Sequence, residues 1–224
     1  MDALLMTDQL SREHLLTTLT ERLRTRVIMS GSRMSPELSY GRHRGPVPAN
    51  SRVASVLVAL YQHPQLGWTI PLTKRPDHLE HHPGQICFPG GRVEPGEDLE
   101  TAAFREFVEE LGCEPHAPMV LGQLTSLYVY ASRNHVHPIV CVMECPKHFW
   151  RPDPNEVAEV IELPIQRLLD PAARIRVKKT RQLGQSKDPK CQFSFIAPAF
   201  EHDGDEIWGA TAMLLDELAT VLQA

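Results

Sequence analysis

The sequence lacks several features that mark proteins acting on membranes or nucleic acids. It contains no run of about 20 apolar residues, the length that a helix needs to cross a bilayer. Aromatic residues make up only 6% of the chain and the net charge is −5, so a basic surface for nucleic acid is not expected. The most basic segment, residues 174–181, alternates as an exposed strand does. Contact with a substrate phosphate is its alternative interpretation.

Cysteine is also scarce, and its five positions do not suggest a disulfide framework or a zinc site. The number is odd, and the residues are scattered through apolar segments: Cys87, Cys113, Cys141, Cys145 and Cys191. Reduced cysteines in a core are the simplest interpretation. The first ten residues carry acids and no basic leader or secretory segment, so we expect a cytoplasmic protein.

Hydrophobic periodicity predicts an α/β protein. Helices are expected at residues 8–28, at 164–169 and at 207–222, besides one at about 99–111. Strands are expected at residues 52–61, 65–75, 119–130, 135–143, 157–163, 174–180 and 191–198. Pro71 argues for an edge position or a bulge in the second strand. We predict an α/β/α sandwich with a mixed sheet, in which residues 1–50 form an N-terminal helix and irregular arm and residues 51–224 form one domain.

Three glutamates crowd one helix of this pattern. Glu106, Glu109 and Glu110 are spaced i, i+3 and i+4, so they are neighbours on the helix surface. Their carboxylates repel one another unless a cation lies between them. A divalent metal ion is one explanation, and a solvated, charged helix face is the other.

The angular positions on this helix favour the metal. Ala103, Phe107 and Leu111 form a core stripe, and Glu106 and Glu110 border it at about 100° per residue. Arg105 and two other side chains point more nearly to solvent on this projection. Neither bordering glutamate has a Lys or Arg four residues later. Partly buried, unpaired carboxylates are costly unless a cation binds them.

The same stretch resembles the Nudix hydrolase signature. The polar positions and the two glycines that define it are all filled, by Gly91, Glu97, Arg105, Glu106, Glu109, Glu110 and Gly112. The resemblance implies an enzyme that uses Mg²⁺ or Mn²⁺ to hydrolyse a nucleoside diphosphate linked to another group. Glu106 and Glu110 would be the principal metal ligands. Glu109 would be a further ligand or a base for the attacking water.

The resemblance also assigns supporting roles. An ion pair between Glu97 and Arg105 would hold the preceding loop against the helix. Gly90 and Gly91 would let the backbone approach the metal or the phosphate, or would simply form a tight turn. Glu156 is the candidate for a base outside the helix, with a surface acid as the alternative.

The segment before the signature, residues 72–91, resembles the additional motif of coenzyme A pyrophosphatases. On that basis Arg75, His82, Gln85 and Gly91 are candidate substrate contacts, although His82 could equally be a buried structural histidine. Glu80 departs from the motif, which has Arg there. The adjacent His81 and His82, together with His78, could suggest a metal site, but neighbouring residues point apart in an extended chain.

These observations leave three hypotheses about function. The first is hydrolysis of coenzyme A or an acyl-CoA to adenosine 3′,5′-bisphosphate and a phosphopantetheine product. The second is hydrolysis of ADP-ribose, NADH or a dinucleotide polyphosphate. The third is a nucleotide-binding module without catalysis. In each case the partner is a small nucleotide, with no nucleic acid and no membrane, and the helix at residues 8–28 would pack on the domain or form a homodimer.

Overall fold

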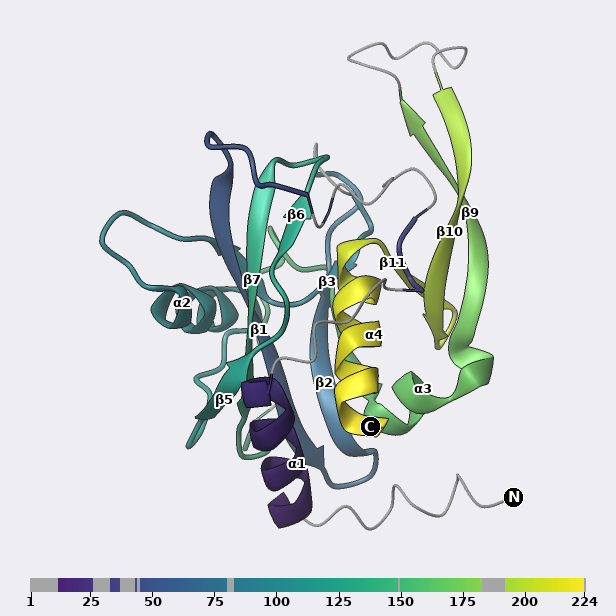
Figure 1. The fold of residues 1–224 in the computed structure, drawn as a ribbon. Coiled ribbons are helices and arrows are strands. Elements are labelled where there is room, and N and C mark those ends of the chain that lie inside the picture. The colour runs from purple at the N-terminus through teal and green to yellow at the C-terminus, as the bar shows by residue number, and fades with distance from the viewer. Residues whose placement is uncertain are drawn as a thin grey trace.

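The computed structural model describes residues 12–25, 33–36, 43, 45–79, 83–148, 150–182 and 192–223. Its centre is an eight-stranded mixed sheet with helices on both faces (Figure 1). The strands are β1 Arg52–His63, β2 Gly67–Lys74, β3 Ile86–Cys87, β4 Gly90–Arg92, β5 Met119–Gln123, β6 Leu127–Val129, β7 Asn134–Val142 and β8 Glu159–Pro164. β1 and β7 are parallel over nine residue pairs, whereas the other pairings in this sheet are antiparallel. The predicted mixed sheet is confirmed.

The two faces of the sheet bury separate hydrophobic clusters, which explains the continuous apolar run in β1. Successive side chains of a strand point to opposite faces. Leu57 and Ala59 pack toward α2 (Leu99–Leu111), whereas Val58 and Leu60 belong to the larger cluster on the other face, with α4 (Ala210–Gln223). A strand covered on both faces has no polar alternation.

The N-terminal helix is part of this larger cluster. α1 (Arg12–Thr25) buries Leu15 and Leu19 completely and contacts α4 and β5. Arg22 also donates from Nη1 to the carbonyl oxygen of Val221, at 2.6 Å. The apolar face that suggested packing or dimerisation is therefore covered within the chain.

A second, three-stranded antiparallel sheet lies on the other side of α4 from the main sheet, at the right of Figure 1. It consists of β9 (Arg174–Gln182), β10 (Gln192–His202) and β11 (Asp205–Trp208), in the order β11-β10-β9. Ion pairs join it to the rest of the protein: Lys74 of β2 contacts Asp205 at 2.7 Å, and Arg167 of α3 (Ile165–Leu169) contacts Glu201. The strand pair around residues 183–190 was predicted, but its separation from the main sheet was not.

Neither of the two positions expected for Pro71 is found, because β2 is not an edge strand and its register with β8 has no shift at Pro71. β2 is an interior strand, with β8 on one side and β1 and β3 on the other. The pairing with β1 ends at Thr69 and the pairing with β3 begins at Thr73. Pro71 lies in the gap between these two ladders, so its missing N–H group breaks neither of them.

Two other boundaries also differ from the prediction. The strand expected over residues 119–130 is divided into β5 and β6, because residues 124–126 leave the ladder between them. The C-terminal helix begins at Ala210 instead of Ile207, since Ile207 belongs to β11 and Gly209 has a positive φ of 72°. Within the described residues, no helix has both the length and the apolar character required to cross a membrane.

Candidate functional site

The glutamates lie on α2, whose ends are fixed by local interactions. Asp98 caps the N-terminus by accepting a hydrogen bond from the amide of Thr101 at 2.7 Å. Gly112 ends the helix in the left-handed conformation, at φ 60°. The face formed by Ala103, Phe107 and Leu111 is fully buried against the sheet. This packing fixes the direction in which the glutamates project.

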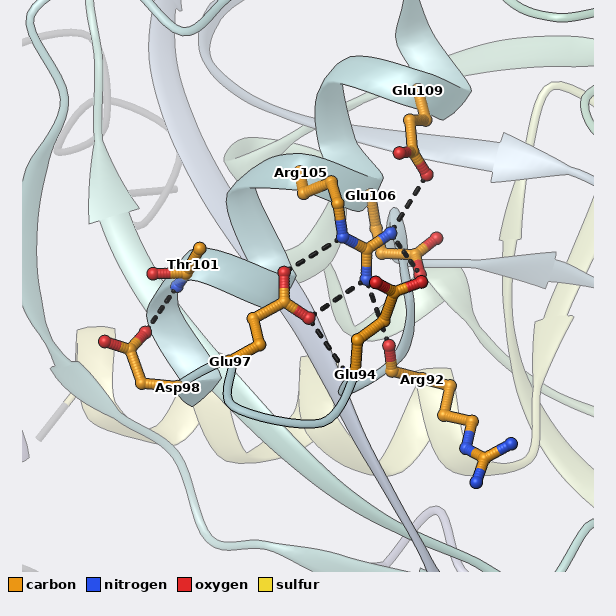
Figure 2. A network of polar contacts seen from close by, with 8 residues as sticks. All are labelled: Arg92, Glu94, Glu97, Asp98, Thr101, Arg105, Glu106 and Glu109. Atoms are coloured by element: carbon orange, nitrogen blue, oxygen red, sulfur yellow. Dashed lines mark hydrogen bonds and ion pairs between the residues drawn. The ribbon is translucent and has the colours of Figure 1, made fainter.

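Arg105 is the centre of a polar network that joins this helix to the loop before it (Figure 2). Its Nε and Nη2 donate to the two carboxylate oxygens of Glu97, at 2.9 and 3.2 Å. Its Nη1 donates to Glu106 at 2.9 Å and to Glu109 at 3.0 Å, and Nη2 also reaches the carbonyl oxygen of Arg92. The ion pair predicted between Glu97 and Arg105 is present. Because Arg105 donates to Glu97, the pKa of that carboxyl is lowered.

Two expectations from the helical projection are wrong. Arg105 does not extend into solvent, since its side chain turns back over the loop and is only 26% exposed. Glu106 is not unpaired, because the guanidinium of the preceding residue reaches it. The projection considered the i+4 position alone, whereas a long arginine side chain can turn toward its own neighbours.

Gly91 is required by the position of the Glu106 carboxylate. A Cβ atom added at Gly91 would lie 2.4 Å from Oε1 of Glu106 and 2.5 Å from Oε2. At Gly90, where φ is 154°, a Cβ would lie 2.4 Å from the carbonyl oxygen of Ser55 in β1. The two glycines thus bring the loop against both the sheet and the carboxylate.

Glu110 is the most deeply buried of the three glutamates, at 4% exposure. Its Oε2 accepts weak hydrogen bonds from the amide of Gly90, at 3.4 Å, and from the hydroxyl of Thr73, at 3.5 Å. Burial raises its pKa to about 8, and the Gly90 amide opposes that rise. The pKa of Glu106 is also raised, first by burial, and the hydrogen bond from Arg105 acts against it.

The three carboxylates do not converge on one point. Among the described residues, no three Asp, Glu, His or Cys side chains are arranged to hold a metal ion. Glu109 is 54% exposed and directed at Arg105, whereas Glu110 points toward Gly90. The donor chemistry still fits Mg²⁺ or Mn²⁺, which prefer carboxylate and carbonyl oxygens. Burial disfavours the charged form of Glu106 and Glu110, so a cation between them would stabilise both.

The remaining predicted residues have different outcomes. Glu156 is exposed, and its charge raises the pKa of both Glu106 and Glu110, so it lies on their side of the molecule. His82 lies outside the described residues, as do Glu80 and His81. His78 is exposed.

Arg75 and Gln85 line one cavity of about 550 Å³. They lie across a backbone turn, in which the Arg75 amide donates to the carbonyl oxygen of Gln85 at 2.9 Å. The Nε atom of Arg75 is buried and has no hydrogen-bond acceptor, and the described residues give its guanidinium no ion pair. The cavity lining contains none of the predicted catalytic glutamates.

Contacts with Cys87 and Arg75 connect this cavity to the glutamates. Cys87 lines the cavity and lies 3.3 Å from the hydroxyl of Thr73, which in turn donates to Glu110. The charge of Arg75 lowers the pKa of Glu110. The cavity and the carboxylates are therefore neighbouring parts of one site.

The aromatic part of the cavity lining was missed in the sequence. It includes Phe193 and Phe195 of β10 and Trp208 of β11, together with Tyr128 of β6. Residues 193–195 read Phe-Ser-Phe, an alternation that places both aromatic rings on one face of a strand. That alternation was the available signal, but nothing in it tells which face the strand presents to the site.

Comparisons with known proteins identify the family of this chain. A family model described as "NUDIX domain" matches residues 51–183. Nudix hydrolase 3 of Caenorhabditis elegans is 29% identical over 160 residues, covering 69% of this chain and 67% of its own length. A protein named "Uncharacterized Nudix hydrolase NudL", from Salmonella paratyphi B, is 34% identical over 171 residues, covering 76% of this chain and 82% of its own.

Among solved structures, the crystal structure of a MutT protein from Methanosarcina mazei Go1 matches 79% of this chain and 99% of its own chain, with a TM-score of 0.49 and 17% identity. The family model covers more than half of the chain, and the signature glutamates Glu106, Glu109 and Glu110 lie within it, in the second half of α2. This protein is a member of the Nudix hydrolase family.

Proposed function

We propose that this hydrolase cleaves the pyrophosphate bond of coenzyme A or an acyl-CoA, with Mg²⁺ or Mn²⁺ bound by Glu106 and Glu110. The observation that carries the proposal is the cavity: Arg75 and Gln85, two side chains of the motif that resembles coenzyme A pyrophosphatases, line it together beside Glu110. A guanidinium at that place, whose buried Nε has no acceptor among the described residues, suits a phosphate oxygen.

The chain's own groups supply most of what the reaction needs. Arg75 binds the pyrophosphate and orients it toward the glutamates. The Glu97–Arg105 ion pair holds the loop that follows Gly90 and Gly91 against α2. The carbonyl oxygen of Gly90 would be a further ligand for the cation. A divalent cation bound at these oxygens would neutralise phosphate charge as a Lewis acid.

A carboxylate must also take the proton of the attacking water. Glu156 and Glu109 are the two candidates, because both are exposed and neither is held in the buried part of the site. The water oxygen forms a bond to one phosphorus while the bond from that phosphorus to the bridging oxygen breaks. Glu109 first has to leave Arg105, at 3.0 Å, whereas the charge of Glu156 acts on Glu106 without such a partner. We therefore assign the base to Glu156.

A substrate panel tests the proposal. Purified protein is incubated with coenzyme A, an acyl-CoA, ADP-ribose, NADH and a dinucleotide polyphosphate, each with Mg²⁺ and with Mn²⁺, and products are separated by chromatography. We expect adenosine 3′,5′-bisphosphate and a phosphopantetheine product at the highest kcat/KM. Much faster hydrolysis of ADP-ribose than of coenzyme A would replace this assignment by the second hypothesis.

A further inference from the structure

Three of the aromatic residues that line the cavity come from the part of the chain beyond the family model. That model ends at residue 183, within the segment between β9 and β10. Phe193, Phe195 and Trp208 all follow it, and so does Met213 of α4, which lines the same cavity. The cavity is thus a joint construction of the family domain and the second sheet.

The rings of these three aromatic residues form a row. Phe193 and Phe195 have ring centroids 5.9 Å apart, and Phe195 and Trp208 follow at 6.0 Å. Their planes are tilted by 33° and 60°, so they do not make a pair of parallel plates that could enclose one flat base. A row of apolar surface suits a linear, flexible chain, which gains free energy with each methylene removed from water.

The charges of the cavity also distinguish between the two halves of a coenzyme A molecule. Its described lining contains one arginine, no lysine and no carboxylate. The arginine, Arg75, lies beside Glu110, where the pyrophosphate would bind. Lys179, which stacks over the Trp208 ring at 5.3 Å, is paired with Glu206 at 2.6 Å.

The adenosine half of coenzyme A carries a further 3′-phosphate, and burying that charge without a partner is costly. The pantetheine half carries no charge beyond the pyrophosphate. Only the second half matches a lining whose described residues, apart from Arg75, include no lysine, no arginine and no carboxylate.

From the row of rings and the distribution of charge, we propose that this cavity is the subsite for the uncharged pantetheine arm of an acyl-CoA and the first part of its acyl chain. The assignment rests on the proposed function. It places the arm against Phe193, Phe195 and Trp208, and it leaves the bisphosphate half outside the cavity. The second sheet would then select among substrates without taking part in the reaction.

Binding to the protein in the presence of EDTA tests the assignment without turnover, since no predicted metal ligand lines the cavity. Tryptophan fluorescence is titrated with 4′-phosphopantetheine, hexanoyl-CoA and adenosine 3′,5′-bisphosphate, and Trp208→Phe identifies the signal of Trp208. We expect the first two ligands to change that signal. Phe193→Ala should weaken hexanoyl-CoA binding about tenfold, the effect of losing a small apolar contact, with no change for the bisphosphate.

Ser194→Ala is the matched control, because Ser194 is the exposed neighbour on the other face of β10, and it should bind as wild type does. Phe193→Leu, which keeps an apolar side chain, should restore most of the affinity if Phe193→Ala is poorly folded. The assignment is overturned if adenosine 3′,5′-bisphosphate changes the fluorescence of Trp208 and competes with hexanoyl-CoA for binding. It is also overturned if Phe193→Ala and Phe193→Leu are both folded and bind every ligand as wild type does. Binding of hexanoyl-CoA at Trp208 without its hydrolysis under Mg²⁺ would instead refute the proposed function and leave the subsite standing.

Discussion

The two neighbouring parts of the site are built in different ways. The Arg105 network lies within residues 92–109, and each of its partners is at most 13 residues from Arg105 in the sequence. The cavity draws its lining from residues 36–213, on both sheets and on α4. The first region is charged and locally encoded, and the second is apolar and assembled only by the tertiary fold. We infer that reaction chemistry and substrate choice are separable in this protein, and four substitutions test that separation.

The largest effect is expected from Glu106→Gln. Loss of a carboxylate that holds the cation should lower kcat about 10³-fold for every substrate of the panel, by removing stabilisation of charge in the transition state. Steady-state kinetics measures the loss of kcat, and the melting temperature shows whether the variant is folded. Glu100→Gln, at an exposed position in the first turn of the same helix, serves as the control and should keep wild-type rates. An unchanged kcat in Glu106→Gln would remove this residue from the mechanism.

Gly91→Ala tests whether the loop has to approach Glu106 this closely. The added methyl group would lie 2.4 Å from the carboxylate, so Glu106 has to move, and a shift of about 1 Å can reduce kcat roughly 10²-fold. Gly67→Ala is a matched control far from the helix. It meets no atom within 4 Å but has φ 70°, so it should lose stability and retain kcat. Equal kcat in both variants would contradict the role given to Gly91.

Arg75→Gln addresses the boundary between the two regions. Its guanidinium has no ion pair in the described structure, so the melting temperature should stay the same. We expect KM to rise about 30-fold for all substrates, because a charge-assisted hydrogen bond to phosphate contributes roughly 2 kcal/mol. Arg52→Gln, at an exposed position of β1, should leave KM unchanged. A change of KM for acyl-CoA alone would place Arg75 in the selecting region instead.

Arg105→Lys should give the smallest effect. Lysine keeps the charge but cannot bind Glu97 through two nitrogens while also reaching Glu106 and Glu109. We expect kcat to fall about tenfold, the effect of one charged hydrogen bond of roughly 1.5 kcal/mol. Arg167→Lys, in α3, breaks a comparable network in which Arg167 contacts Asp170 and Glu201. This variant should change only the melting temperature. If both variants lower kcat alike, the network around Arg105 has no specific role at the site.

Prediction from the sequence succeeded where contacts are local or periodic. Hydrophobic periodicity predicted the longer strands and the helices in their order, but not the short strands β3, β4 and β11. The i, i+3, i+4 spacing identified the glutamate helix. The ion pair between Glu97 and Arg105, only eight residues apart, came from the resemblance to the family signature, and the structure contains it. The position of Pro71 did not follow, because the sequence cannot tell which strands lie beside β2 or where their ladders stop.

The glutamate helix and the fold class are thus determined by the sequence itself, since amphipathic periodicity and capping act over a few residues. The tertiary structure alone decided that Glu110 is buried beside Thr73, and that Phe193, Phe195 and Trp208 line one cavity with Arg75. The physical reason is that burial and cavity shape depend on side chains brought together from distant parts of the sequence. A hydrophobic pattern states only that a side chain is covered, without stating by what.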